Sequence, residues 1–234
     1  MVKKILNYSI VRLRRKPPTA GRTIVLGITG GIACGKSLIT RFFRDLGAAV
    51  LSADELAREA VRPGEDVFQQ IVAHFGEEIL TTEGTIDRSR LARKIFLAPE
   101  ERQQLNQITH PAIGHLADLR ISELQKRREV PLIVYEAPLL FEAKGEERVD
   151  LVLVVASTPE RQLERLMRRD NLSREEALQR ISAQMPLSEK ISRSDILIKN
   201  NGSPEETQKL IAGIYTQLTA LKKNPPKSED LPSF

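Results

Sequence analysis

The 234-residue sequence is poor in the features that mark secreted, zinc-binding or membrane-spanning proteins. Cys34 is the single cysteine, so no intramolecular disulfide can form, which is typical of a reducing cytoplasm. No stretch approaches the roughly 18 consecutive apolar residues of a membrane span. No group of His and Cys residues has the spacing of zinc ligands. We therefore expect a cytoplasmic protein without a membrane partner and without a zinc site.

Acidic residues are missing from the first 22 positions, which carry seven Lys and Arg residues. The rest of the chain has 29 basic and 31 acidic residues, although the whole chain has a net charge of +5. The basic character thus belongs to the leader, and we expect no nucleic-acid partner for the body of the protein. The leader, 1–22, resembles a transit peptide in its charge but has few hydroxyl residues, and a disordered extension is the alternative that we favour.

Short apolar runs alternate with segments of helical periodicity along the rest of the chain. Pro111 is predicted to begin a long helix that reaches about residue 128. Thr158 is predicted to be the N-cap of a helix that begins at residue 159. This alternation predicts an α/β fold with a mainly parallel, five-stranded sheet between helices, whose ligand binds beyond the carboxyl ends of the strands. The predicted strands are 23–29, 48–52, 132–135, 151–155 and 196–198. The tail, 222–234, holds three prolines and is predicted to be disordered.

The segment from Gly30 to Ser37 matches the phosphate-loop pattern G-x-x-x-x-G-K-S/T between a predicted strand and a predicted helix. Glycines let consecutive backbone N–H groups converge on phosphate oxygens, and the helix that follows directs its positive end at them. Lys36 would add a charge near the β- and γ-phosphates, and the Ser37 hydroxyl would bind Mg²⁺. Within this loop, Cys34 is interpreted as a small filler rather than as an oxidation-sensitive switch.

Several polar residues near predicted strand ends leave two interpretations open. Asp54 is either the base that accepts a proton from an attacking hydroxyl or a helix N-cap. Glu136 either binds Mg²⁺ through water or is a solvated loop residue. Arg58, His74 and His110 either contact a substrate or are ordinary surface and capping residues. An N-K-x-D signature is absent, which argues against a GTPase.

Six segments in order resemble the successive motifs of the dephospho-CoA kinase family, over about residues 23–220. They are G-I-T-G-G-I-A-C-G-K-S, S-A-D-E-L-A-R, H-F-G at 74–76, H-P-A-I at 110–113, A-P-L-L-F-E at 137–142 and Q-L-E-R-L-M-R-R-D at 162–170. The resemblance implies a three-layer P-loop kinase fold over 23–221, with an acceptor-binding helical region at 54–130 and a lid at about 165–195. It also implies transfer of the ATP γ-phosphoryl group to the ribose 3′-hydroxyl of dephospho-CoA, the last step of coenzyme A synthesis, with Mg²⁺.

On the matching positions, the resemblance implies that Asp54 is the general base, that Lys36 holds phosphate and that Arg165 stabilises the moving phosphoryl group. The nucleotide contacts would come from Gly30, Gly31, Ile32, Ala33, Cys34, Gly35, Lys36, Ser37 and Leu38. The acceptor contacts would come from Asp54, Arg58, His74 and His110. The sequence departs from the family pattern at Ser52, where aspartate is usual, and at Ala33 and Cys34, where Gly-Ser is commoner.

Three other functions are compatible with the phosphate loop or the leader. Another small-molecule kinase, such as a nucleoside or shikimate kinase, would differ in the acceptor region. A nucleotide-binding switch would need no catalytic base, and a nucleic-acid-binding protein has support only from the leader. A monomer or a small homo-oligomer is expected.

Overall fold

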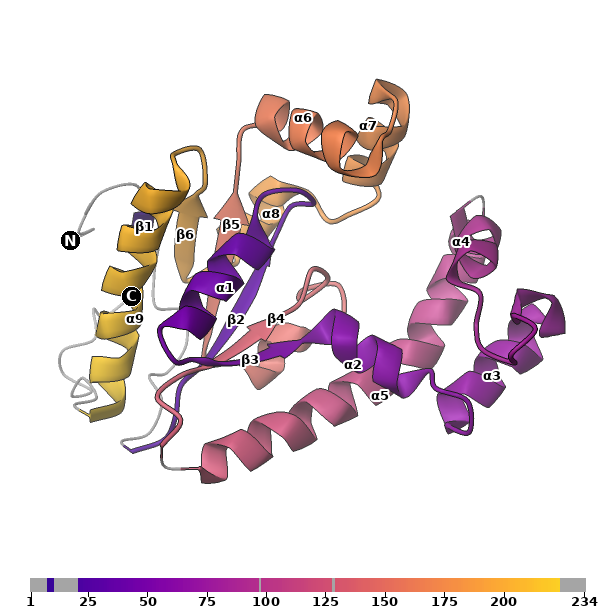
Figure 1. Cartoon of the computed structure of the whole chain (residues 1–234), viewed down its shortest axis with the longest axis horizontal. Coiled ribbons are helices and arrows are strands. Elements are labelled where there is room, and N and C mark those ends of the chain that lie inside the picture. Colours follow the sequence, from indigo (N-terminus) through magenta and orange to yellow (C-terminus); the bar gives the residue numbers. More distant parts are fainter. Residues whose placement is uncertain (1–7, 11–20, 97, 128, 224–234) are drawn as a thin grey trace. The chain divides into compact units, whose positions relative to one another are not determined.

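The computed structural model describes residues 8–10, 21–96, 98–127 and 129–223. The chain divides into two compact units. The first unit comprises the residues up to Leu51 and those from Ile121 onward, and the second comprises Ser52–Arg120. Figure 1 traces the chain by colour.

The first unit is built on a sheet with the strand order β1-β6-β5-β2-β4-β3. β2 pairs in parallel with both β4 and β5, and β5 pairs in parallel with β6. All six residues of both β2 and β5 are buried, as expected of strands covered on both faces. The strands are β1 (Tyr8–Ile10), β2 (Val25–Gly30), β3 (Ala49–Ser52), β4 (Ile133–Glu136), β5 (Leu151–Ala156) and β6 (Ile196–Lys199).

A sixth strand joins the five that the sequence predicts, and it comes from the leader. Tyr8–Ile10 pairs antiparallel with Ile196–Ile198 of β6. The prediction of a disordered 1–22 is therefore wrong for these three residues, while 1–7 and 11–20 lie outside the described residues. Without β1, β6 would present the unpaired backbone groups of an edge strand. Three residues are too few to show an alternating pattern in the sequence.

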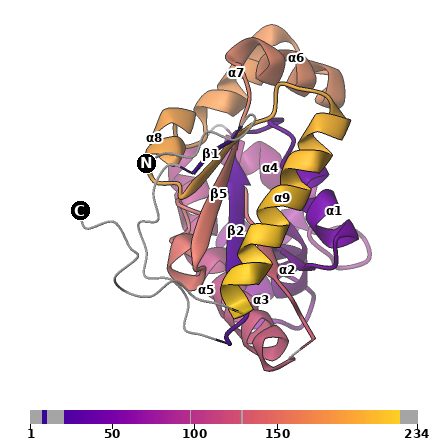
Figure 2. The same ribbon diagram turned by 90° about the vertical axis from the view of Figure 1, so that its left-hand side faces the viewer.

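Helices cover both faces of this sheet. On one face, α1 (Lys36–Asp45) and α9 (Pro204–Lys223) pack against each other and share an apolar core with the strands. On the other face, α8 (Leu187–Ser192) contacts β5, and Figure 2 shows α8 across the sheet from α1. α9 runs to Lys223, so the predicted disorder is wrong for residues 222 and 223, and 224–234 lie outside the described part.

The helices of the first unit begin and end where local chemistry allows. α1 ends before Gly47, which has a positive φ of 98° and whose N–H donates to the Arg44 carbonyl at 2.9 Å. Thr158 caps α6 (Pro159–Asp170) by accepting a hydrogen bond from the Arg161 N–H, which confirms the predicted cap. α7 (Arg174–Ser182) follows α6, and the 3₁₀ turn η2 (Gly145–Arg148) lies between β4 and β5.

The second unit is helical, as the sequence predicts for most of 54–130. Its apolar cluster joins buried side chains of α3, η1 and α4: Val67, Ile71, Phe75, Ile79 and Leu91. Its elements are α2 (Ala53–Ala60), α3 (Asp66–Phe75), η1 (Glu77–Ile79), α4 (Arg88–Phe96) and α5 (Pro99–Lys126), the end of which belongs to the first unit. Within the described ranges, no helix combines the length and apolar content that crossing a membrane requires.

The prediction that Pro111 begins a helix is wrong, because α5 already starts at Pro99. Pro111 lies inside α5, where its missing N–H leaves the carbonyl four residues earlier without the usual helical bond. The helix continues through it because Leu105 and Ile108 before the proline, and Ala112 after it, pack against the same apolar cluster. Tertiary packing here outweighs a local helix breaker.

Cys34 belongs to the core of the first unit and has an exposed fraction of 0%. Burial raises the pKa of its thiol, and the nearby charges of Lys36 and Arg165 only partly oppose this effect. The thiol therefore stays protonated at neutral pH and is out of reach of solvent.

We expect Cys34 of the native protein to react with iodoacetamide at pH 8 more than about tenfold more slowly than in urea, since reaction needs an exposed thiolate. Mass spectrometry of quenched samples measures both rates. Equal rates in the folded and unfolded protein would contradict the buried position.

Candidate nucleotide-binding site

The phosphate loop lies at the carboxyl end of β2, between that strand and α1, as its pattern predicts. Gly30, the last residue of β2, has φ 149°, and a Cβ built on it would lie 2.1 Å from the Val155 carbonyl oxygen of β5. Only glycine lets the backbone turn this close to the neighbouring strand. The first glycine of the motif thus fixes where the loop leaves the sheet.

Two polar side chains pack directly on two other glycines of the loop, Gly31 and Gly35. A Cβ on Gly31 would lie 2.7 Å from Nε2 of Gln162, and one on Gly35 would lie 2.2 Å from Nδ2 of Asn200. Asn200 is buried, and its Nδ2 donates to the Cys34 carbonyl at 2.9 Å. Sequence reasoning missed both residues, although Asn200 lies two residues beyond the predicted fifth strand and directly follows β6.

The Lys36 ammonium group lies within the loop. Lys36 is 9% exposed, and its Nζ donates to the carbonyls of Gly30 at 3.2 Å and Gly31 at 2.9 Å. A buried lysine charge at the start of a helix makes the loop attractive to polyanions. The structure thus brings the predicted phosphate-binding charge to the loop.

Ser37 and Glu136 come together from α1 and β4. The Ser37 hydroxyl donates to Oε1 of Glu136 at 3.3 Å, and Glu136 is the last residue of β4. A hydroxyl and a carboxylate are the oxygen ligands that Mg²⁺ prefers, and this cation commonly takes only one or two protein groups. The pair fits such a site, while no cluster of three or more His, Cys, Asp or Glu suited to a metal occurs among the described residues.

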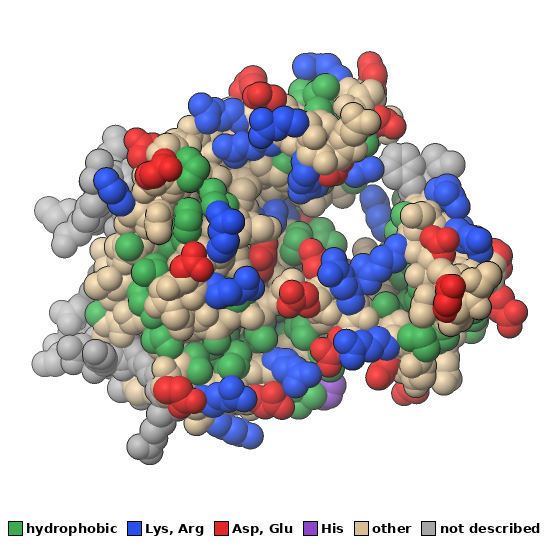
Figure 3. All heavy atoms as spheres, viewed as in Figure 1, with side chains coloured by type: hydrophobic (Ala, Val, Ile, Leu, Met, Phe, Trp, Pro, Cys, Tyr) green, Lys and Arg blue, Asp and Glu red, His purple; other side chains and the backbone are tan. Residues whose placement is uncertain are grey.

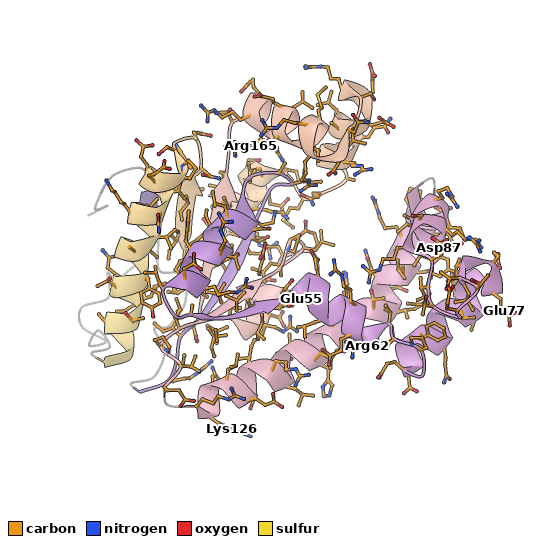
Figure 4. All side chains as sticks on the ribbon, in the orientation of Figure 1. Glu55, Arg62, Glu77, Asp87, Lys126 and Arg165 are labelled. Carbon is orange, nitrogen blue, oxygen red and sulfur yellow. The ribbon has the colours of Figure 1, made fainter. Side chains whose placement is uncertain are left out.

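Arg165 of α6 reaches the loop region of the first unit. Its Nη2 donates to the Asn200 carbonyl at 3.3 Å, and its charge is near enough to act on the Cys34 thiol. Figure 4 labels it on the side of α6 that faces the strands. Arg169, by contrast, bonds to Asp170 at 2.7 Å, and this bond holds the pKa of the Asp170 carboxyl below its usual value. Of these two arginines, Arg165 is therefore the one beside the loop.

Asp54 lies in the second unit, near the start of α2, and its side chain is exposed. The N-cap of α2 is Ser52, whose hydroxyl accepts from the Glu55 N–H at 3.4 Å. The capping interpretation of Asp54 is therefore wrong. Its carboxylate is not used to start the helix.

A cavity of about 580 Å³ lies within the second unit. Its walls are mainly apolar, with arginine side chains and the polar Asn106 and Thr109 among them. Arg58 lines it, as do Arg62 and Arg88, which the sequence gave no signal to single out.

Neither predicted histidine is among the residues that line this cavity. His74, at the end of α3, bonds through Nε2 to Glu101 at 2.7 Å. It also packs edge-on against Phe75. His110 lies half-buried within α5. His74 and His110 thus lie outside the set of residues that line the cavity.

Charges of both signs occur on the surface of the first unit. Over α6 and α7, Figure 3 shows Lys and Arg side chains interspersed with Asp and Glu. Ion pairs such as Arg180–Asp170 account for part of this pattern. The face in view thus matches the near-neutral body expected from the composition.

A family model described as dephospho-CoA kinase matches residues 24–206. The chain is 51% identical over 193 residues to the dephospho-CoA kinase of Geobacter sulfurreducens, covering 82% of this chain and 98% of that one. It is 47% identical over 201 residues to the dephospho-CoA kinase of Geobacillus kaustophilus, covering 86% and 100%.

Solved structures agree with this result. The protein TT1252 of Thermus thermophilus superposes with a TM-score of 0.69 at 36% identity, covering 84% of this chain and 98% of that one. The dephospho-CoA kinase of Campylobacter jejuni gives 0.65 at 29% identity, with 84% and 97% covered. The predicted P-loop kinase fold is confirmed, and the chain belongs to the dephospho-CoA kinase family.

Proposed function

We propose that this protein transfers the γ-phosphoryl group of ATP to the ribose 3′-hydroxyl of dephospho-CoA, giving coenzyme A and ADP. The observation that carries the proposal is the family match over residues 24–206, which includes both the phosphate loop and the helical unit that follows β3. It places the reaction in the last step of coenzyme A synthesis.

The nucleotide would bind along the phosphate loop. Backbone N–H groups of the loop and of the start of α1 would bind the phosphates, and Lys36 would supply positive charge beside them. Ser37 and Glu136 would hold Mg²⁺, the latter through water, because their oxygens already lie 3.3 Å apart. When bound, Mg²⁺ neutralises charge on the β- and γ-phosphates.

In the transfer, Asp54 would accept the proton of the acceptor hydroxyl while a bond forms between that oxygen and the γ-phosphorus. The bond from the γ-phosphorus to the β–γ bridging oxygen breaks, and ADP leaves with that oxygen. The exposed Asp54 carboxylate is available for this role because Ser52 caps α2. Arg165 would stabilise the charge on the moving group, a role supported by its place beside the loop.

The second unit would hold the acceptor. Its apolar cavity suits the pantetheine arm of dephospho-CoA, and Arg58, Arg62 and Arg88 suit the diphosphate. Roles for His74 and His110 in acceptor binding, and for 165–195 as a lid that excludes water, follow from the family pattern. We expect a cytoplasmic enzyme that acts as a monomer or a small homo-oligomer.

ADP release with Mg·ATP tests the acceptor directly. We expect fast turnover with dephospho-CoA and only background release with adenosine, shikimate or no acceptor. The reason is that the cavity suits a pantetheine arm, which neither adenosine nor shikimate carries. A coupled assay of ADP measures the rates. Turnover with shikimate or adenosine instead would identify another small-molecule kinase, and no acceptor-dependent turnover would indicate a nucleotide-binding switch.

Asp54→Asn should lower kcat by about 10²- to 10⁴-fold, since asparagine cannot accept the proton. The KM for ATP should stay near its wild-type value, because the loop is unchanged. Asp66→Asn is the matched control, since Asp66 is an exposed acid in the first turn of another helix of the same unit. Full activity of Asp54→Asn would rule out the assigned base.

Ser37→Ala and Glu136→Gln should each raise the Mg²⁺ concentration for half-maximal rate by about tenfold or more, because each removes an oxygen from the expected site. The measurement is a Mg²⁺ titration at fixed ATP, followed by ADP release. Glu160→Gln, which changes an exposed acid on α6, is the control. An unchanged Mg²⁺ requirement in both variants would contradict this assignment.

A further inference from the structure

Both backbone groups of one loop residue, Ile32, are hydrogen-bonded to glutamine side chains. Nε2 of Gln162, on α6, donates to the Ile32 carbonyl at 2.9 Å. Oε1 of Gln184, which lies beyond the end of α7, accepts from the Ile32 N–H at 3.1 Å. We call Gln162 and Gln184 the glutamine clamp. Both glutamines thus hydrogen-bond to the loop from segments that are far from it in sequence.

Apolar contacts hold the same part of the loop. The side chains of Ile32 and Ala33 pack against a cluster formed by α6 and α7, whose buried members are Leu163, Leu166 and Ala177. The tip of the phosphate loop is therefore seated on these two helices by apolar burial as well as by the clamp.

Gln184 is itself held in place through its neighbour in the chain. The Met185 N–H donates to Oε1 of Glu142 at 3.2 Å, and the same oxygen pairs with Nζ of Lys190 at 2.8 Å. Lys190 is fully buried, and its Nζ also donates to the Pro138 carbonyl at 2.9 Å. A buried cation with two partners makes a rigid support, because moving either partner would leave its charge unsatisfied. The backbone beside Gln184 is thus fixed.

The loop has a conformation that needs such support. Ala33 has φ 58°, a left-handed value that residues with a side chain adopt at a cost. The glutamine clamp bonds to the N–H and the carbonyl of Ile32, the residue directly before Ala33. Fixing the Ile32 backbone restricts the path of the loop residues that follow, whose backbone would bind the phosphates of a nucleotide.

We propose that Gln184 is a positioning residue for nucleotide binding, acting with Gln162 to orient the Ile32 backbone of the phosphate loop. The inference rests on the proposed function in one respect, because it takes ATP as the ligand of the loop. It does not depend on which acceptor receives the phosphoryl group. Gln184 acts through the loop backbone and takes no part in the chemical step.

Gln184→Met tests the proposal, because methionine keeps the length of the side chain and its thioether sulfur is only a weak hydrogen-bond acceptor. Losing one net hydrogen bond predicts a Kd for Mg·ATP about threefold to tenfold higher, measured by calorimetry on the full chain without acceptor. The KM for ATP should rise by the same factor, while kcat at saturating ATP stays within about twofold. This split between KM and kcat distinguishes positioning of the loop from general damage.

Gln179→Met is the matched control, since Gln179 is an exposed glutamine on α7 and its substitution should leave the Kd unchanged. Gln162→Met should raise the Kd in the same direction as Gln184→Met. A Kd that is unchanged or lower in Gln184→Met, while wild-type protein binds ATP, would overturn the inference but leave the kinase intact. Wild-type protein that does not bind Mg·ATP would overturn the proposed function and, with it, this inference.

Discussion

The close approach of the phosphate loop to β5 is the constraint on which the rest of the site depends. A Cβ at Gly30 would lie 2.1 Å from the Val155 carbonyl oxygen, so the backbone can leave β2 on this path only without a side chain. This path leads into α1 and sets where Lys36 and Ser37 lie. A site for a polyanion therefore follows from a steric condition at one residue.

Residues distant in sequence then complete the loop. Asn200 lies over Gly35, and Gln162 lies over Gly31, so a side chain at either glycine would collide with a particular neighbour. α6 carries both Gln162 and Arg165, and it packs through apolar residues against the tip of the loop. The position of the arginine and the conformation of the loop are consequently set by the same contacts.

In the second unit, apolar packing rather than a close backbone approach determines the local structure. Its apolar cluster is strong enough to keep α5 helical through Pro111, against the local preference of proline. The helices that surround this cluster also enclose a cavity with arginines at its walls. The pocket that we propose for the acceptor thus lies in a unit where packing overrides local propensity.

The sequence by itself determined the α/β class, the five predicted strands, the phosphate loop with Lys36 and Ser37, and the family, because these depend on local patterns and fixed spacing. It misplaced the start of α5, because tertiary packing keeps the helix continuous through Pro111. It missed β1, because that strand forms by pairing with the open edge of β6. It left Asp54 open between a base and an N-cap, and the structure excludes the N-cap because Ser52 caps α2. Only the tertiary structure brought Glu136 to Ser37 and Gln184 to Ile32, because the contacts that join them span 99 and 152 residues of chain.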